Sequence, residues 1–229
     1  YWDFEKAKNQ AKSKWNQALG KIDFKADDNT KTIFYTALYH SYFAPTVFSD
    51  VNGDYMGTDK QVYNDKSHQN YTVFSLWDTD RALHPLMTIL EETKSKDYVS
   101  SMLRICQQQG KLPVWHVWAN ETNTMVGLPA IPVIADAILK GIVDKNELEL
   151  AYEAIKTTAM GTDFGLRYVR DLKHIPIEYM DHESVAWALE YAIADFGAYQ
   201  AAKFLGKTED ASYFEKRYKL YEQYFDIEV

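Results

Sequence analysis

The sequence lacks several features that mark whole classes of protein. It has one cysteine, Cys106, among 229 residues, which excludes a disulfide framework and a cysteine-rich zinc site. No apolar run approaches the ~20 residues needed to span a bilayer. The chain has no run of lysine or arginine and carries a formal net charge of −8, so nucleic acid is not an expected partner. It also contains no P-loop, dinucleotide fingerprint or Gly-x-Ser-x-Gly motif.

Glycine and proline are scarce as well, at 10 and 6 residues, whereas aromatic residues are abundant. Seventeen Tyr, 11 Phe and 6 Trp make up 15% of the chain, and apolar residues reach 46%. This composition is typical of a folded chain that buries a sizeable core, either one large domain or two small ones.

Apolar residues recur at three- and four-residue steps along most of the chain, which predicts about eight helices. They are expected over about residues 4–19, 30–43, 79–92, 98–109, 131–142, 145–159, 183–205 and 209–225. Turn residues and strand formers over residues 45–76 instead predict a long loop or a β-hairpin. Because the helices come in sequential pairs, we expect an all-α fold. A closed six-pair toroid needs roughly twelve helices, so we expect these residues to form an incomplete (α/α)6 toroid.

Three stretches combine residues that carry chemistry, and the first is 72–86. Trp77, Asp78 and Arg81 come together where a strand-like run meets a helix. A sugar needs an apolar face to stack on and charged groups for its hydroxyls. The alternative is an ordinary helix cap, with Trp77 in the core and Arg81 paired to Asp78.

The second stretch, 112–127, contains Trp115, Trp118, Asn120 and Glu121 in an irregular segment. A carboxyl group in an aromatic, partly dry site has a raised pKa and can act as a general acid. The alternative is a carboxylate at a helix start, which the helix dipole stabilises.

The third stretch, 175–196, contains Glu183 and Glu190, seven residues apart and so expected on one helix face. Such carboxylates could bind a hard cation or a polyol. His182 is a further candidate sugar contact. The alternative is a capping segment whose acids are solvated.

Together these stretches resemble glycoside hydrolase family 92, the calcium-dependent exo-acting α-mannosidases. The resemblance extends from about residue 5 to 225, in the family's order and approximate spacing. The matching segments are 35–40, 50–55, 71–86, 112–115, 120–123, 125–127, 132–137, 140–142, 183–185 and 189–192.

The resemblance implies a β-sandwich followed by an (α/α)6 toroid. Residues 1–229 resemble the first two thirds of the toroid alone, and they would contact the sandwich. It implies a secreted or periplasmic enzyme that removes terminal mannose from α-mannosides, including α-1,2-linked glycan branches, with inversion. The Glu of the family's Asn-Glu-Thr motif, its general acid, is Glu121 here. Ca²⁺ is implied as a cofactor, and Glu183 and Glu190 are its candidate ligands.

The family's general base belongs to a later acidic motif that this sequence does not contain, so residues 1–229 alone are expected to be inactive. Both ends of the chain read as cut rather than natural. A non-catalytic helical module that binds carbohydrate or protein remains the alternative function. The sequence departs from the family pattern at positions that bear on sugar or linkage specificity: Asp80, Leu128, Pro129, Ala186 and Ala194.

Overall fold

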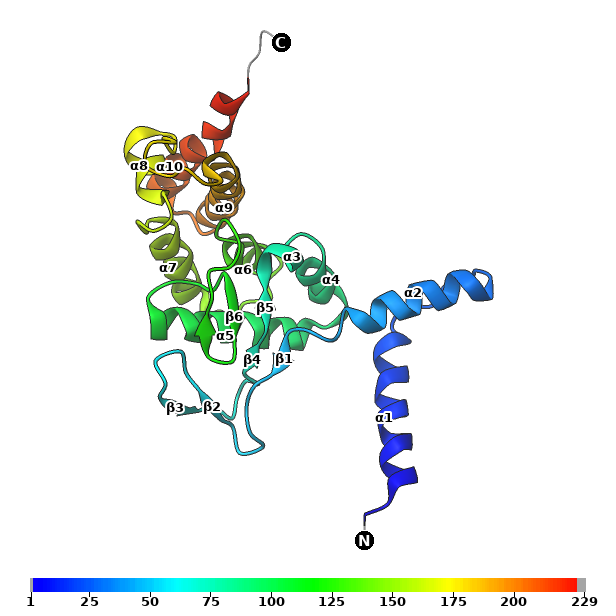
Figure 1. Ribbon diagram of the computed structural model, residues 1–229. Coiled ribbons are helices and arrows are strands. Elements are labelled where there is room, and N and C mark those ends of the chain that lie inside the picture. Colours follow the sequence, from blue (N-terminus) through cyan, green and yellow to red (C-terminus); the bar gives the residue numbers. More distant parts are fainter. Residues whose placement is uncertain (1, 226–229) are drawn as a thin grey trace. The chain divides into compact units, whose positions relative to one another are not determined.

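The computed structural model describes residues 2–225 (Figure 1). The chain separates into two compact units, residues 1–44 and 45–229, and each is described by itself. All the candidate site residues belong to the second unit.

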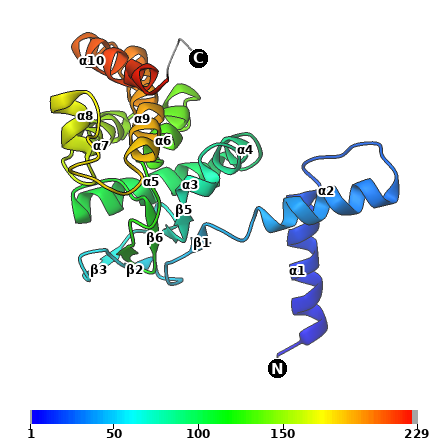
Figure 2. The same cartoon turned by 45° about the horizontal axis from the view of Figure 1, so that its top comes forward.

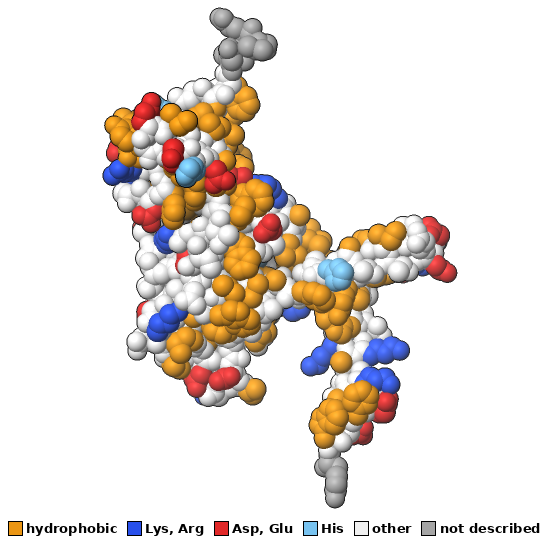
Figure 3. Space-filling model, viewed as in Figure 1, with side chains coloured by type: hydrophobic (Ala, Val, Ile, Leu, Met, Phe, Trp, Pro, Cys, Tyr) orange, Lys and Arg blue, Asp and Glu red, His pale blue; other side chains and the backbone are white. Residues whose placement is uncertain are grey.

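The first unit consists of two helices, α1 (Phe4–Leu19) and α2 (Asp28–His40). Each begins at an aspartate whose side chain accepts a backbone N–H three residues on, as an N-cap should. Trp15 of α1 lies edge-on to Tyr39 of α2, with ring centroids 4.4 Å apart. The apolar residues that predict α2 are only partly buried within the unit: Leu38 is buried, but Ile33 is 63% exposed. Figure 3 shows hydrophobic side chains along both helices, with lysines on α1.

The second unit begins with the strands that the sequence placed in residues 45–76. The predicted hairpin is present as β2 (Asp54–Met56) and β3 (Val62–Asn64), which pair antiparallel. A second antiparallel pair joins β1 (Thr46–Val47) to β4 (Tyr71–Thr72). A third, three-stranded sheet in the order β5-β6-β7 combines β5 (Phe74–Ser75), β6 (Trp115–Val117) and β7 (Asn120–Glu121).

Helices make up most of the second unit. They are α3 (Leu76–Thr79), α4 (Leu83–Leu90), α5 (Glu92–Gln109), α6 (Ala130–Leu139), α7 (Leu148–Ala159), α8 (Leu166–Leu172), α9 (Ser184–Phe204) and α10 (Thr208–Tyr218), followed by a 3₁₀ helix at Lys219–Tyr224. The predicted helix over 79–92 is interrupted. A continuous helix would need a backbone N–H at Pro85, which proline lacks, and α4 instead starts two residues before it. Helix α8 lies between the predicted helices over 145–159 and 183–205, where no helix was expected.

The helix-rich prediction is therefore confirmed, but the all-α description is incomplete because three small sheets are present. The toroid remains a prediction. Among the described residues, no helix is both long and apolar enough to cross a membrane.

Helix α9 organises the core of the second unit, packed between α6 and α10 (Figure 2). It approaches α6 closely at Gly197, where an added Cβ would lie 3.1 Å from the Cα of Pro132. On its other side the buried Asp195 pairs with Arg217 of α10, whose guanidinium also donates to the Ala159 carbonyl at 2.7 Å. This pair joins α9, α10 and the end of α7.

Candidate active site

The candidate catalytic residue, Glu121, lies on a β-hairpin rather than at a helix start. Strands β6 and β7 pair Val117 with Asn120, so the turn contains only Trp118 and Ala119. Both have positive φ, 48° and 58°. A two-residue hairpin turn of this type usually contains Asn-Gly, because other side chains are strained there.

Contacts from outside the hairpin hold this strained turn in place. The Trp118 N–H donates to the Thr72 hydroxyl at 2.9 Å. Lys60, in the β2–β3 loop, donates to the Ala119 carbonyl and to the Asn120 side chain, both at 2.6 Å. Lys60 was not among the predicted site residues, and no sequence motif marks it, because its role depends on a contact 59 residues away.

Three backbone N–H groups converge on the Glu121 carboxylate. Val114 donates to Oε2 at 2.8 Å, while Trp115 and Asn123 donate to Oε1 at 2.9 and 2.8 Å. Each carboxyl oxygen can accept two hydrogen bonds. Oε1 is therefore saturated, and Oε2 retains one position that can carry a proton or meet a ligand.

Directly across the strands from Glu121 lies the buried His116. Burial lowers the pKa of His116 to about 4, against the smaller opposing effect of Glu121. The imidazole is therefore neutral near pH 7. The three amides that donate to Glu121 and the ring paired with it are therefore uncharged, and the nearby charge is the Lys60 ammonium bound to Asn120.

Of the other residues predicted in this stretch, Trp115 acts through its backbone, and its ring is half-buried. Its carbonyl accepts from both the amide and the hydroxyl of Thr122. Asn120 donates from its side chain to the Trp118 carbonyl at 3.0 Å and accepts from Lys60. The structure thus brings Trp115, Asn120 and Glu121 together in one hairpin.

A second group forms where α3 meets α9. The Arg81 guanidinium lies over the Trp77 ring, 5.3 Å from its centroid, and donates to Glu190 Oε1 at 2.6 Å. The sequence had offered Asp78 as the alternative partner of Arg81, and the structure gives Glu190 instead. Trp77 itself is half-buried and packs against the apolar cluster around Trp187 and Tyr191.

Beside this ion pair lies Asp80, whose carboxyl is buried. Its Oδ1 has no hydrogen-bond partner among the described residues, and the Arg81 Nε is 3.8 Å away. Burial raises the pKa of Asp80 to about 6; Arg81 lowers it less, and Glu190 adds to the increase. Asp80 is one of the positions at which the sequence was expected to depart from the family pattern.

Gly127 links the two groups. Its φ of 91° favours glycine, and an added Cβ would lie 2.6 Å from the Cβ of Glu190. Glu190 therefore packs directly on the segment that follows Glu121, six residues after the carboxylate.

The remaining predicted residues are exposed. Asp78 faces solvent on α3, and His182 is 86% exposed, with its Nε2 3.3 Å from Asp181. Glu183 is not in the helix: it is the N-cap of α9 with a φ of 55°, so the expected shared helix face with Glu190 is not formed as predicted.

These positions fit Ca²⁺ poorly as a pair. Calcium takes six to eight oxygen ligands, but Glu190 already gives one oxygen to Arg81. Within the described part of the chain, neither Glu183 nor Glu190 belongs to a group of three or more His, Cys, Asp or Glu side chains with ligand atoms within 4.8 Å of one another.

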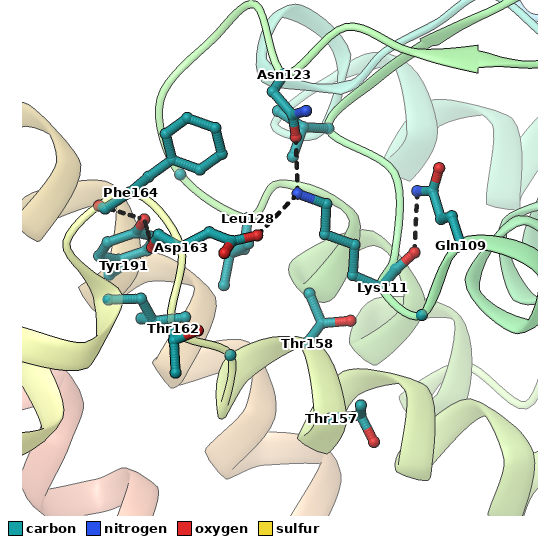
Figure 4. Close-up of a pocket in the computed structure, with 15 residues that line it drawn as sticks. Gln109, Lys111, Asn123, Leu128, Thr157, Thr158, Thr162, Asp163, Phe164 and Tyr191 are labelled. Atoms are coloured by element: carbon teal, nitrogen blue, oxygen red, sulfur yellow. Dashed lines mark hydrogen bonds and ion pairs between the residues drawn. The ribbon is translucent and has the colours of Figure 1, made fainter.

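A cavity of about 260 Å³ adjoins the Glu121 hairpin (Figure 4). Val114 and Asn123, two of the residues that donate to Glu121, line it. Lys111 extends between Asn123 and Asp163, with its Nζ 3.0 and 3.4 Å from their side-chain oxygens. Apolar side chains such as Leu128, Phe164 and Leu166 also line the cavity, beside the polar groups that Lys111 bridges.

Comparisons with known proteins agree with the proposed family. The model of the glycosyl hydrolase family 92 catalytic domain matches residues 1–229. A family GH92 α-mannosidase from Bacteroides thetaiotaomicron is 39% identical, with a TM-score of 0.94 over 98% of this chain and 31% of that structure. A family GH92 inverting mannosidase from the same organism is 28% identical, with a TM-score of 0.85 over 96% of this chain and 31% of the other.

A curated relative, described as an uncharacterized secreted glycosidase of Arthroderma benhamiae, is 27% identical over 94% of this chain and 26% of its own length. The chain thus spans about a third or less of the relatives it matches. The helical fold, the Asn-Glu-Thr hairpin and these matches together show that the chain belongs to glycosyl hydrolase family 92, within its catalytic domain.

Proposed function

We propose that this chain is part of an inverting exo-α-mannosidase that removes terminal mannose from α-mannosides, including α-1,2-linked glycan branches. Relatives of the same family are described as α-mannosidases and as an inverting mannosidase, which supports the proposal. The observation that carries it is the Glu121 carboxyl group, held by three amides with one free position on Oε2.

In this mechanism Glu121 holds a proton on Oε2 and gives it to the glycosidic oxygen as the bond to the sugar breaks. The negative charge that remains is stabilised by the three N–H donors, which are in place beforehand. The three donors also fix the position of the carboxyl group, so its free Oε2 position is aimed before the substrate binds.

Inversion needs a second carboxylate about 6.5–9.5 Å away to activate water on the opposite face of the sugar. The motif that supplies this base in the family has no counterpart in this sequence. We therefore propose that residues 1–229 alone bind sugar weakly at most and do not turn over.

The proposed sugar contacts come from the Glu121 hairpin and from the group around Trp77 and Arg81. The Trp77 ring with Arg81 against it, and the exposed Asp78, offer an apolar face and charged partners for hydroxyls. Trp115, Asn120 and His182 remain proposed contacts. The alternative is a non-catalytic module that binds carbohydrate or protein, in which these tryptophans would be buried and Glu121 would lie in solvent. The exposed Trp118 ring and the three amides that hold Glu121 favour the enzyme.

Calcium remains part of the proposal through the family resemblance, and Glu183 and Glu190 remain its candidate ligands in this chain. They fit the ion poorly as a pair, because Arg81 occupies one Glu190 oxygen and Glu183 lies outside the helix, so other ligands would have to supply most of its coordination. Secretion is proposed from the curated relative's description, and contact with a β-sandwich domain from the family resemblance.

The experiment is hydrolysis of an α-mannoside by the full-length protein, followed by proton NMR of the first sugar released. The β-anomer should form first. Release of α-mannose first would exclude the inverting mechanism. Turnover by residues 1–229 alone would overturn the claim that these residues lack the base.

A further inference from the structure

Three side chains that can bind a metal ion come together outside the Glu121 site. His68, in the segment between β3 and β4, offers a ring nitrogen, and Asp144 and Glu147, between α6 and α7, each offer a carboxylate oxygen. These three atoms lie within 4.8 Å of one another, and all three residues are half-buried. We propose that His68, Asp144 and Glu147 bind a zinc ion, with water completing its coordination.

The ligand set decides the class of metal. One imidazole nitrogen with two carboxylate oxygens suits Zn²⁺, whereas Ca²⁺ prefers six to eight oxygens. A tetrahedral zinc ion with ligands at about 2.0–2.1 Å holds them about 3.4 Å apart. The present spacing therefore requires only a small closure of side chains.

Hydrogen bonds and ion pairs with neighbouring residues already orient the His68 and Glu147 side chains. The His68 Nδ1 lies 3.1 Å from the Ser67 hydroxyl and 3.5 Å from Asp65, which leaves Nε2 for the metal. The Ser100 hydroxyl donates to Glu147 Oε1 at 3.2 Å. A carboxylate behind a ligating histidine is the usual outer shell of a zinc site.

One face of α5 connects these outer contacts. Lys96, Ser100 and Arg104 are spaced four residues apart and so share that face. Lys96 lies 3.6 Å from Asp144, Ser100 bonds Glu147, and Arg104 bonds Asp65. A rigid helix thus holds both halves of the cluster, which come from segments about 75 residues apart.

The surrounding charge favours a cation. Asp65, Asp144 and Glu147, with Asp97 nearby, provide four carboxylates against the cations Lys96 and Arg104. The pKa of Asp97 is raised by burial, with smaller opposing effects that include His68 and Arg104. A divalent ion would neutralise the excess negative charge and tie the β3–β4 segment to the α6–α7 connection.

The test is zinc binding by the chelator-stripped, full-length protein, measured by calorimetry with ZnCl₂ and by metal content after dialysis. We expect one tight equivalent that His68→Ala and Glu147→Gln each weaken about 100-fold or more, and Asp65→Asn about 10–100-fold. His174→Ala is the matched control. Its ring is exposed and lies 3.0 Å from the Leu172 carbonyl, away from the proposed ligands in the chain, so zinc binding should be unchanged.

Zinc should also raise the unfolding temperature of the parent and of His174→Ala, but not of the ligand variants. Circular dichroism checks the fold, and Glu147→Gln decides the result if His68→Ala is unfolded. Retention of the tight equivalent in both ligand variants would overturn the proposal. So would its loss in His174→Ala, or its displacement by a modest excess of Ca²⁺.

Discussion

Two glutamates of the second unit are held in opposite ways. Glu121 accepts three backbone N–H groups in a strained hairpin, and its neighbour His116 is neutral near pH 7. Glu190, on α9, is paired with the Arg81 guanidinium and lies near the buried Asp80.

The difference shows how one chain can prepare two carboxyl groups for different tasks. Three backbone donors fix the position of the Glu121 carboxyl group and leave one place on Oε2 free for a proton, which a general acid requires. The guanidinium of Arg81 instead forms a charge-assisted pair with Glu190. Glu190 is therefore suited to positioning Arg81 beside Trp77 rather than to proton transfer.

The largest expected effect comes from replacing each glutamate by glutamine in the full-length protein. Glu121→Gln should lower kcat on an unactivated α-mannoside by about 10³-fold, within the range for a general acid. Glu190→Gln should cost about 10-fold, mainly in KM, because it disturbs binding rather than chemistry.

Steady-state kinetics of both variants measures this contrast. Both oxygens of Glu121 accept backbone N–H groups, but the NH₂ group of a glutamine cannot accept a hydrogen bond. Glu121→Gln can therefore lose stability as well as activity, and its unfolding temperature must be measured together with its rate. Equal losses of kcat in the two folded variants would contradict the different roles assigned to Glu121 and Glu190.

The next effect is on stability and concerns Asp80. Its pKa is raised from 3.8 to about 6, so between about pH 4 and 6 the folded protein holds a proton that the unfolded chain has released. Asp80 therefore destabilises the fold increasingly as the pH rises through this window, by on the order of 2 kcal/mol above it.

Asp80→Asn should remove this dependence, raising the free energy of unfolding at pH 8 by on the order of 2 kcal/mol and changing it little at pH 4. Urea unfolding at a series of pH values measures it. The exposed Asp78→Asn is the control and should leave the profile unchanged. A gain that is equal at pH 4 and pH 8 would contradict the assignment.

The smallest effect is expected from Arg81→Met. Because Arg81 is half exposed, loss of its pair with Glu190 should cost less than about 1 kcal/mol of stability. Arg81 opposes the increase in the Asp80 pKa, so in Arg81→Met the fall in stability should still begin near pH 4 and should extend to a higher pH. A loss of several kcal/mol in urea unfolding would show that the pair holds α3 to α9 rather than orienting a binding group.

Much of the helical framework was predictable because it depends on local signals. The bounds of α1 agree with the predicted helix, and the Asp27 cap, the Gly110 end of α5 and the β2–β3 hairpin follow from residues beside them. Glu121 was located through the family resemblance, but the sequence left open whether it started a helix.

The site's geometry depends on contacts that no local pattern contains. Lys60 reaches the Trp118–Ala119 turn from 59 residues away, and Arg81 passes over the nearby Asp78 to pair with Glu190, 109 residues on. The positive φ angles at Trp118 and Ala119 run against their residue types, so sequence preference alone would not place a tight turn there.

The central claim is that Glu121 donates the proton to the leaving group, and the leaving-group dependence of Glu121→Gln tests it most directly. The kcat/KM of the variant and the parent should be compared on an alkyl α-mannoside and on a dinitrophenyl α-mannoside, whose leaving group needs little protonation. We expect the kcat/KM of Glu121→Gln to fall about 10³-fold on the alkyl substrate and less than about 10-fold on the activated one. An equal loss on both substrates would contradict it.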